Sequence, residues 1–73
     1  MATATYTSCI DQIGETAGTV WQLLSDVGPL SLSKLARQID APRDVVMQAI
    51  GWLAREDKIW IDEESRSRIV SLR

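Results

Sequence analysis

The periodicity of the sequence changes within residues 45–61, VVMQAIGWLAREDKIWI, and this change restricts the folds open to the chain. The first part repeats apolar residues at the three-to-four-residue spacing of one buried helical face: Val46, Ala49, Ile50 and Leu53. A charged segment, residues 55–58, follows, and then three β-forming residues, 59–61. The pattern therefore predicts a helix that passes almost directly into a strand.

A longer helix is predicted near the N-terminus. It should start at Ser8, whose hydroxyl can cap the backbone, while Asp11 three residues on completes a capping-box pattern. Gly28-Pro29 should end it. Its apolar residues share one face, on which Trp21 is interpreted as core: Ile10, Ile13, Ala17, Val20, Trp21 and Leu24. Gly14 and Gly18 lie beside that face, where small residues favour the close approach of another backbone.

A short second helix is predicted between these two. Leu30 reads as a stub of extended chain, and either Ser31 or Ser33 can cap the helix that follows. The inward positions of this helix are Leu32, Leu35, Ala36 and Ile39. Residues 40–42 form the next break, and Pro42 suits the first turn of the third helix, predicted over about 42–56.

The C-terminal residues predict a β-hairpin. One strand should cover residues 58–62, a charged tip 63–67, and a return strand 68–72. Acidic residues on the first arm face Arg66 and Arg68 on the second, and such pairs support a register. The fold class is therefore α+β: a winged helix-turn-helix of three helices followed by a two-stranded β-hairpin wing. It should occupy residues 8–73, preceded by a flexible tail, residues 1–7.

Two blocks carry a more specific resemblance. They are the segments GWLARED-K at 51–58 and AG-x-VW at 17–21. In these segments the chain resembles a small bacterial family of stand-alone winged helix-turn-helix proteins, a domain of unknown function. The wider superfamily implies DNA binding through the third helix, with the wing as an accessory. Other members of that superfamily are protein-interaction modules. The resemblance brings no catalytic or cofactor residue with it.

The third helix offers side chains that suit DNA. A rotation of about 100° per residue places Asp44, Gln48, Gly51 and Arg55 outward. Arginine can bond to guanine edges and glutamine to adenine edges, whereas the other cations suit phosphates. The candidate DNA-binding residues are Lys34, Arg37, Arg43, Gln48, Arg55, Lys58, Arg66 and Arg68. The acids at 62–64 would cancel much of the wing's positive potential, so cross-strand pairing is the competing interpretation there.

Three residues indicate contact with another chain instead. Gly51 costs a helix about 1 kcal/mol relative to alanine, which a closely approaching backbone would justify. Trp52 lies beside the inward face of its helix, and its exposure would indicate an interface. Trp60 points opposite to its isoleucine neighbours in a regular strand, so one apolar surface is left over. A homodimer or a protein partner is therefore the alternative to DNA.

Composition narrows the function further. The chain has no His and one Cys, Cys9, expected to be semi-buried, so neither a zinc site nor a disulfide framework is expected. The sequence contains neither a nucleophile–base pair nor a phosphate-binding loop. We therefore expect no enzymatic activity, no metal and no cofactor. No signal peptide or membrane span is predicted, which favours a cytoplasmic protein. All eight Lys and Arg lie in residues 31–73, despite a net charge of −2. Two hypotheses stay open: a dimeric DNA-binding transcription regulator, or a winged helix that binds protein.

Overall fold

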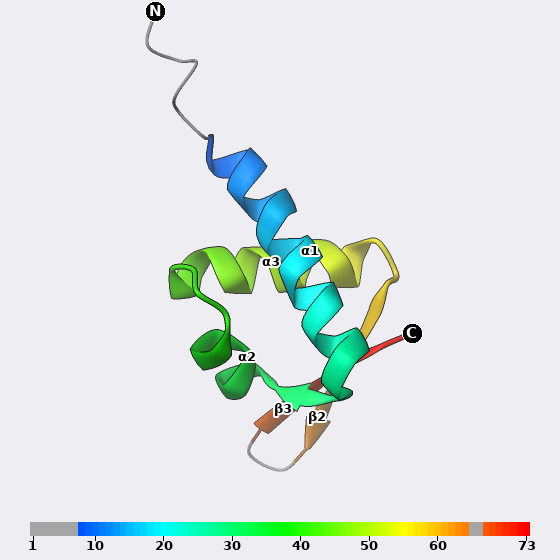
Figure 1. Cartoon of the computed structure of the whole chain (residues 1–73). Helices are drawn as coiled ribbons and strands as arrows, with labels where there is room; N and C mark the ends of the chain where they lie inside the picture. Colours follow the sequence, from blue (N-terminus) through cyan, green and yellow to red (C-terminus); the bar gives the residue numbers. More distant parts are fainter. Residues whose placement is uncertain (1–7, 65–66) are drawn as a thin grey trace, which may run out of the picture.

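The computed structural model describes residues 8–64 and 67–73. The predicted tail and two residues of the predicted wing tip, Ser65 and Arg66, lie outside the described residues. The elements run in the order α1 Cys9–Val27, β1 Leu30–Ser31, α2 Leu32–Gln38, α3 Arg43–Arg55, β2 Ile59–Glu64 and β3 Ser67–Leu72 (Figure 1). This order confirms the predicted α+β winged helix-turn-helix fold.

Both predicted caps of the first two helices are confirmed. The Ser8 hydroxyl accepts a hydrogen bond from the Asp11 backbone N–H at 3.1 Å, and α1 begins at the next residue. Of the two predicted cap residues of α2, Ser31 and Ser33, it is Ser31 that caps the helix. Its hydroxyl accepts a hydrogen bond from the Lys34 backbone N–H at 3.2 Å. Each hydroxyl satisfies a backbone donor that the first turn of a helix leaves unpaired.

The passage from α3 to β2 follows from the way α3 ends. The Asp57 N–H donates to the Ala54 carbonyl at 3.1 Å, and the Lys58 N–H donates to the Leu53 carbonyl at 3.0 Å. These two bonds form a Schellman motif, in which the residue just past the helix adopts a left-handed conformation. Asp57 takes that conformation with φ of 60°. The chain therefore reverses within two residues and enters β2 at Ile59.

We expect Asp57→Gly to raise the free energy of unfolding by up to about 1 kcal/mol, because glycine adopts positive φ without the steric penalty of a Cβ. The ion pair of Asp57 with Arg73, 3.3 Å between Oδ1 and Nη1, is exposed and contributes little. Urea denaturation followed by circular dichroism measures the change. Asp57→Ala is the matched control, since it removes the same ion pair and keeps the strain. An equal stabilisation by alanine would contradict the conformational explanation.

The wing contains one more strand than the two predicted. The sheet order is β1-β3-β2, so the extended stub at Leu30 becomes an edge strand that pairs antiparallel with β3. The hairpin itself pairs Ile61 with Val70 and Glu63 with Arg68. Its arms reach Glu64 and Ser67, beyond the predicted strand ends. The sequence predicted the extended stub but not its partner, because pairing between distant segments leaves no local periodicity.

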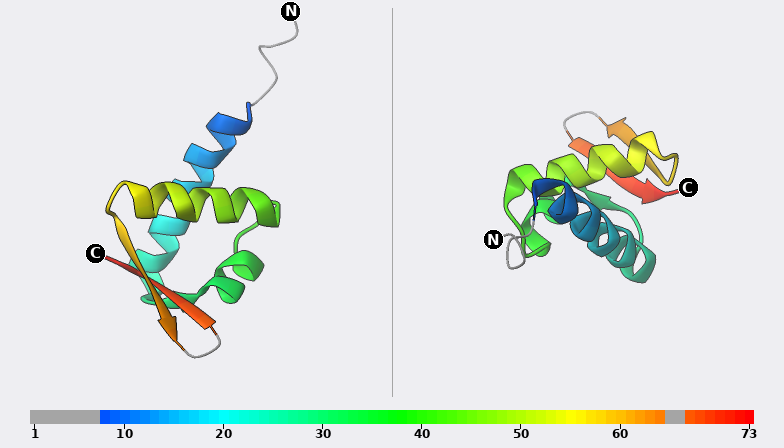
Figure 2. Two further views of the ribbon diagram at one scale, coloured as in Figure 1. Left: turned by 180° about the vertical axis from the view of Figure 1, so that it is seen from behind. Right: turned by 90° about the horizontal axis from the view of Figure 1, so that it is seen from above.

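The core lies where α1 crosses α3 above α2 and the sheet (Figures 1 and 2). Every element except β1 contributes a buried apolar side chain to it. The members, each less than 9% exposed, are Ala17, Val20, Leu24, Leu35, Ile39, Val45, Val46, Ala49, Ile50, Leu53, Ile59 and Val70. The four inward positions predicted for α3 are all among them.

Three members of the predicted α1 face are not in the core, and one of them, Ile13, is half-buried. Ile10 is 79% exposed and Trp21 is 42% exposed, so their assignment to the core was wrong. The first turns of α1 extend past α3 and away from the other described elements (Figures 1 and 2), which agrees with the exposure of Ile10. Cys9, on the same turns, is exposed rather than semi-buried. Helical spacing places these side chains on one face, but burial also needs a neighbouring element.

Candidate nucleic-acid interface

The outward face of α3 is open to solvent. Gln48, Gly51 and Arg55 are exposed, as is Asp44 at the start of the helix. The opposite face buries the core positions, which agrees with the orientation predicted from helical spacing. Seen from the side opposite α1, α3 lies across the front of the domain (Figure 2, left). This face is therefore accessible to a large partner.

The short helix α2 adds two cations to the same helix-turn-helix unit. Lys34 and Arg37 are exposed and three residues apart, so they lie on one side of α2, away from buried Leu35. Arg43, also exposed, begins α3 across the turn from α2. The structure thus keeps these three cations within one supersecondary unit.

The basic residues divide into paired and unpaired groups. Arg68 pairs with Glu63 at 3.3 Å, and Arg73 pairs with Asp57 at 3.3 Å. Among the side chains that the structure describes, the remaining cations have no carboxylate within 4.0 Å: Lys34, Arg37, Arg43, Arg55 and Lys58. Unpaired cations are available to an anionic partner without first breaking a bridge. Most of the positive charge that could meet such a partner therefore lies outside the described wing.

The predicted pairing across the wing is confirmed for one of its two arginines. Glu63 and Arg68 are register partners, and their side chains bond through Oε2 and Nε. Both are largely exposed, so the pair adds little stability, but it reduces the charge that Arg68 presents. Arg66, the other predicted wing contact, lies outside the described residues.

Asp44 has a structural explanation. Pro42, which precedes α3, provides no side-chain cap, whereas an Asp44 carboxylate oxygen accepts from the Val45 backbone N–H at 2.9 Å. A negative charge in the first turn also interacts favourably with the helix dipole. The acid on the outward face of α3 thus stabilises the start of that helix.

The predicted interface residues are all exposed. Trp52 and Trp60 each leave 52% of their surface accessible. Trp60 turns away from the domain while Ile59 is buried, and the Arg73 guanidinium lies 4.1 Å from the Trp60 ring centroid. Apart from the neighbouring residues and backbone of α3, no described atom lies within 4 Å of the position that a Cβ on Gly51 would occupy. The close backbone contact predicted at Gly51 is therefore not made by residues 8–64 and 67–73.

A groove between α1 and α3 brings Lys58, a predicted DNA contact, beside Trp21 and Trp52. It encloses about 280 Å³ and is lined by Gly14, Ala17, Gly18, Trp21, Trp52, Leu53 and Lys58. Lys58 is thus set apart from the outward face of α3 and lies beside the two tryptophans. Within the part of the chain that the structure describes, no other element packs closely on Gly14 or Gly18, since a Cβ at either glycine meets no atom within 4 Å outside the neighbouring residues and backbone of α1.

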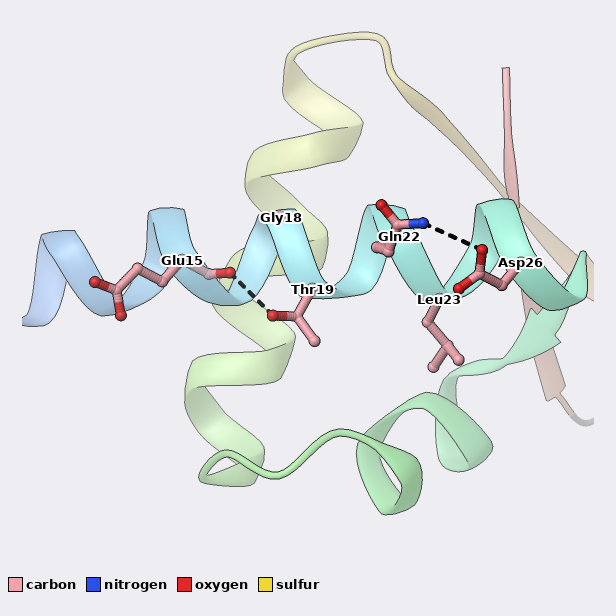
Figure 3. A pocket seen from close by; sticks show the side chains of 6 residues that line it. All are labelled: Glu15, Gly18, Thr19, Gln22, Leu23 and Asp26. Carbon is pink, nitrogen blue, oxygen red and sulfur yellow. Dashed lines mark hydrogen bonds between the residues drawn. The ribbon is translucent and has the colours of Figure 1, made fainter.

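A second hollow lies on the other flank of α1, and Gly18 borders both (Figure 3). It encloses about 470 Å³ and carries the carboxylates of Glu15 and Asp26. Its polar side chains bond locally: Thr19 Oγ1 donates to the Glu15 carbonyl at 3.2 Å and Gln22 Nε2 donates to Asp26 Oδ1 at 3.1 Å (Figure 3). This flank is acidic and therefore unsuited to nucleic acid.

In residues 8–64 and 67–73, no group of three or more His, Cys, Asp or Glu side chains is placed to hold a metal ion. Within the same residues, no helix combines the length and apolar character needed to cross a membrane.

Three helices, a short edge strand and a hairpin wing define a winged helix protein. The family described as Winged helix-turn-helix domain (DUF2582) matches residues 9–72, and the chain belongs to this family. An uncharacterized protein of Methanocaldococcus jannaschii is 42% identical over 65 residues, which cover 85% of this chain and 91% of that protein. The predicted resemblance is confirmed, although this relative is archaeal and a restriction to bacteria is not confirmed. No solved structure matches the chain.

Proposed function

We propose that this protein binds double-stranded DNA through the outward face of α3 and acts as a cytoplasmic transcription regulator. The observation that carries the proposal is the open face of α3, with Gln48 and Arg55, next to unpaired cations on α2. A helix-turn-helix presents its second helix to the major groove while the first crosses the backbone. The residues on these two helices suit those two tasks.

Position along α3 assigns the roles. The N-terminal residues of a recognition helix contact base edges, so Arg43 and Gln48 are proposed to bond to guanine and adenine respectively. Arg55 lies twelve residues after Arg43, about 18 Å along the axis at 1.5 Å per residue, and is assigned to a phosphate. Lys34 and Arg37 on α2 are assigned to phosphates that fix orientation.

The remaining predicted contacts are secondary. Arg68 would meet phosphates with its charge partly neutralised by Glu63, 3.3 Å away. Lys58 lies in the groove beside Trp21 and Trp52, apart from the outward face of α3. Arg66 completes the predicted set on the wing.

The test is a salt titration with a labelled duplex of random sequence, followed by fluorescence anisotropy. If the three cations assigned to phosphates, Lys34, Arg37 and Arg55, each neutralise one phosphate, log K should fall with log salt at a slope of about −2.7, or −0.9 per contact. Lys34→Ala with Arg37→Ala should make that slope less steep by about 2 and weaken binding to all sequences alike. Arg43→Ala should weaken binding to a selected sequence by about 1–3 kcal/mol.

A charge-neutral control separates these contacts from general electrostatics. The double variant Glu63→Ala with Arg68→Ala removes an ion pair from the wing and leaves net charge unchanged, so its slope should stay close to that of the unmodified protein. Absence of duplex binding at low salt would overturn the proposal. Equal losses in the α2 variant and the wing variant would overturn the assignment of residues.

A second candidate is a winged helix that binds another protein. The observation that favours it is the exposure of Trp52 and Trp60, since aromatic side chains beside arginine are typical anchors of protein interfaces. This alternative would be preferred if the duplex is not bound while Trp52→Ala or Trp60→Ala abolishes association with a protein.

A further inference from the structure

Two of the three large apolar side chains that α1 leaves exposed, Ile10 and Trp21, lie on one flank of the helix, whereas the third, Val27 at its C-terminal end, does not. Ile10, Gly14 and Trp21 fall within about 40° of rotation around the helix axis at 100° per residue, and Gly18 lies about 40° further round. Across the groove, α3 adds Trp52. Ile10 is 79%, Trp21 42% and Trp52 52% exposed, which makes this the main apolar flank of α1 that the fold leaves uncovered.

The two glycines make this flank flat. Each glycine in a helix interior costs about 1 kcal/mol relative to alanine, and no described residue outside α1 crowds either position. Nothing inside the domain therefore requires glycine there. A large side chain from outside could lie directly on the backbone of α1 at Gly14 and Gly18, beside the exposed indoles.

The charges that border this flank indicate which kind of partner can cover it. The exposed charges of α1 are all acidic, Asp11, Glu15 and Asp26, while the far border of the groove carries Lys58. In a two-fold symmetric interface each border meets the opposite border of the partner, so a patch with one acidic and one basic side is complementary to itself. DNA would be repelled by α1, whereas a second copy presents both charges in the required places.

The length of α1 also favours a partner on this flank. Its first turns extend beyond α3 without support from the domain (Figure 2). Short helical segments without tertiary packing are marginal in water, so a contact that covers Ile10 would also stabilise these turns.

From these observations we infer that a second copy of this chain docks on the α1–α3 flank, forming a two-fold symmetric dimer. Trp21 and Trp52 of one protomer cover Gly14 and Gly18 of the other, and Lys58 lies near the acidic border of the partner's α1. The inference is independent of DNA binding.

Sedimentation equilibrium over a wide range of concentration tests the inference, starting with the unmodified chain, which should show a monomer–dimer equilibrium. Gly18→Leu should weaken the dimer by about tenfold or more, because the new side chain occupies the space meant for the partner's indole. A Cβ at this position meets no described atom outside the neighbouring residues and backbone of α1, and the change removes a helical glycine, so thermal stability measured at low concentration should not fall.

Thr19→Leu is the matched control, since it adds the same side chain to an exposed position on the other flank of α1 and should leave the dimer unchanged. Trp21→Ala should weaken the dimer as Gly18→Leu does. Lys58→Glu should weaken it most at low salt, because the added charge faces the partner's acids. A chain that is monomeric at every concentration, or a dimer that Gly18→Leu and Thr19→Leu affect equally, would overturn the inference.

Discussion

Leu35→Ala is expected to lower the free energy of unfolding by about 2–5 kcal/mol, the usual range for a leucine truncated in a packed core. Leu35 has no exposed surface, and it is the buried residue through which the seven-residue α2 packs against the rest of the core. A domain of this length has a total stability of about 4–11 kcal/mol at roughly 0.05–0.15 kcal/mol per residue. The substitution should therefore remove about half of it, and with it the fixed position of Lys34 and Arg37.

Urea denaturation followed by tryptophan fluorescence measures this loss. Val27→Ala is a suitable control, because it also shortens an aliphatic side chain but at a position that is 56% exposed. We expect the control to change the unfolding free energy by less than about 0.5 kcal/mol. Similar midpoints for the two variants would show that α2 is not held by Leu35.

Gly28→Ala is expected to cost about 1–3 kcal/mol, for a reason that involves the backbone alone. Gly28 ends α1 with φ of 86° and ψ of −164°, a region that side chains with a Cβ rarely enter. Apart from the two adjacent residues, no described atom lies within 4 Å of the position of that Cβ, so crowding by another element does not contribute. The strain would fall on the link that directs the chain from α1 into β1.

Gly51→Ala provides the comparison, because its Cβ would also meet open space but its backbone is helical. There alanine should raise the unfolding free energy by about 1 kcal/mol. Thermal unfolding of both variants should thus give melting temperatures on opposite sides of that of the unmodified protein. Two shifts of the same sign would show that φ at Gly28 does not set its cost.

DNA binding through α3 and dimerisation through α1 together predict the symmetry of the DNA sequence that is bound. An isologous dimer presents two equivalent copies of α3, and paired recognition helices bind half-sites related by the same symmetry. A dimer formed through α1 should therefore favour a palindromic sequence over a single half-site. A selection experiment with random duplexes would reveal that symmetry.

Much of the candidate site followed from the sequence, because helical spacing decides which residues share a face. Gln48 and Arg55 face outward because Val46 and Ala49 face inward. The pairing of Arg68 with Glu63 also followed, since a hairpin sets cross-strand neighbours. The bridge between Arg73 and Asp57, sixteen residues apart, did not, because it depends on where β3 ends relative to the turn after α3.

The local structure could be predicted from the sequence: the capping serines, the breaks at Gly28 and residues 40–42, and the change from helix to strand between Arg55 and Ile59. These features depend on backbone bonds and conformations within a few residues. Which apolar residues are covered depends instead on how the elements pack against one another. Trp21 belongs to an apolar face, yet it is partly exposed because α3 leaves a groove beside it. Periodicity tells which side chains point the same way, whereas burial depends on what the folded chain places opposite them.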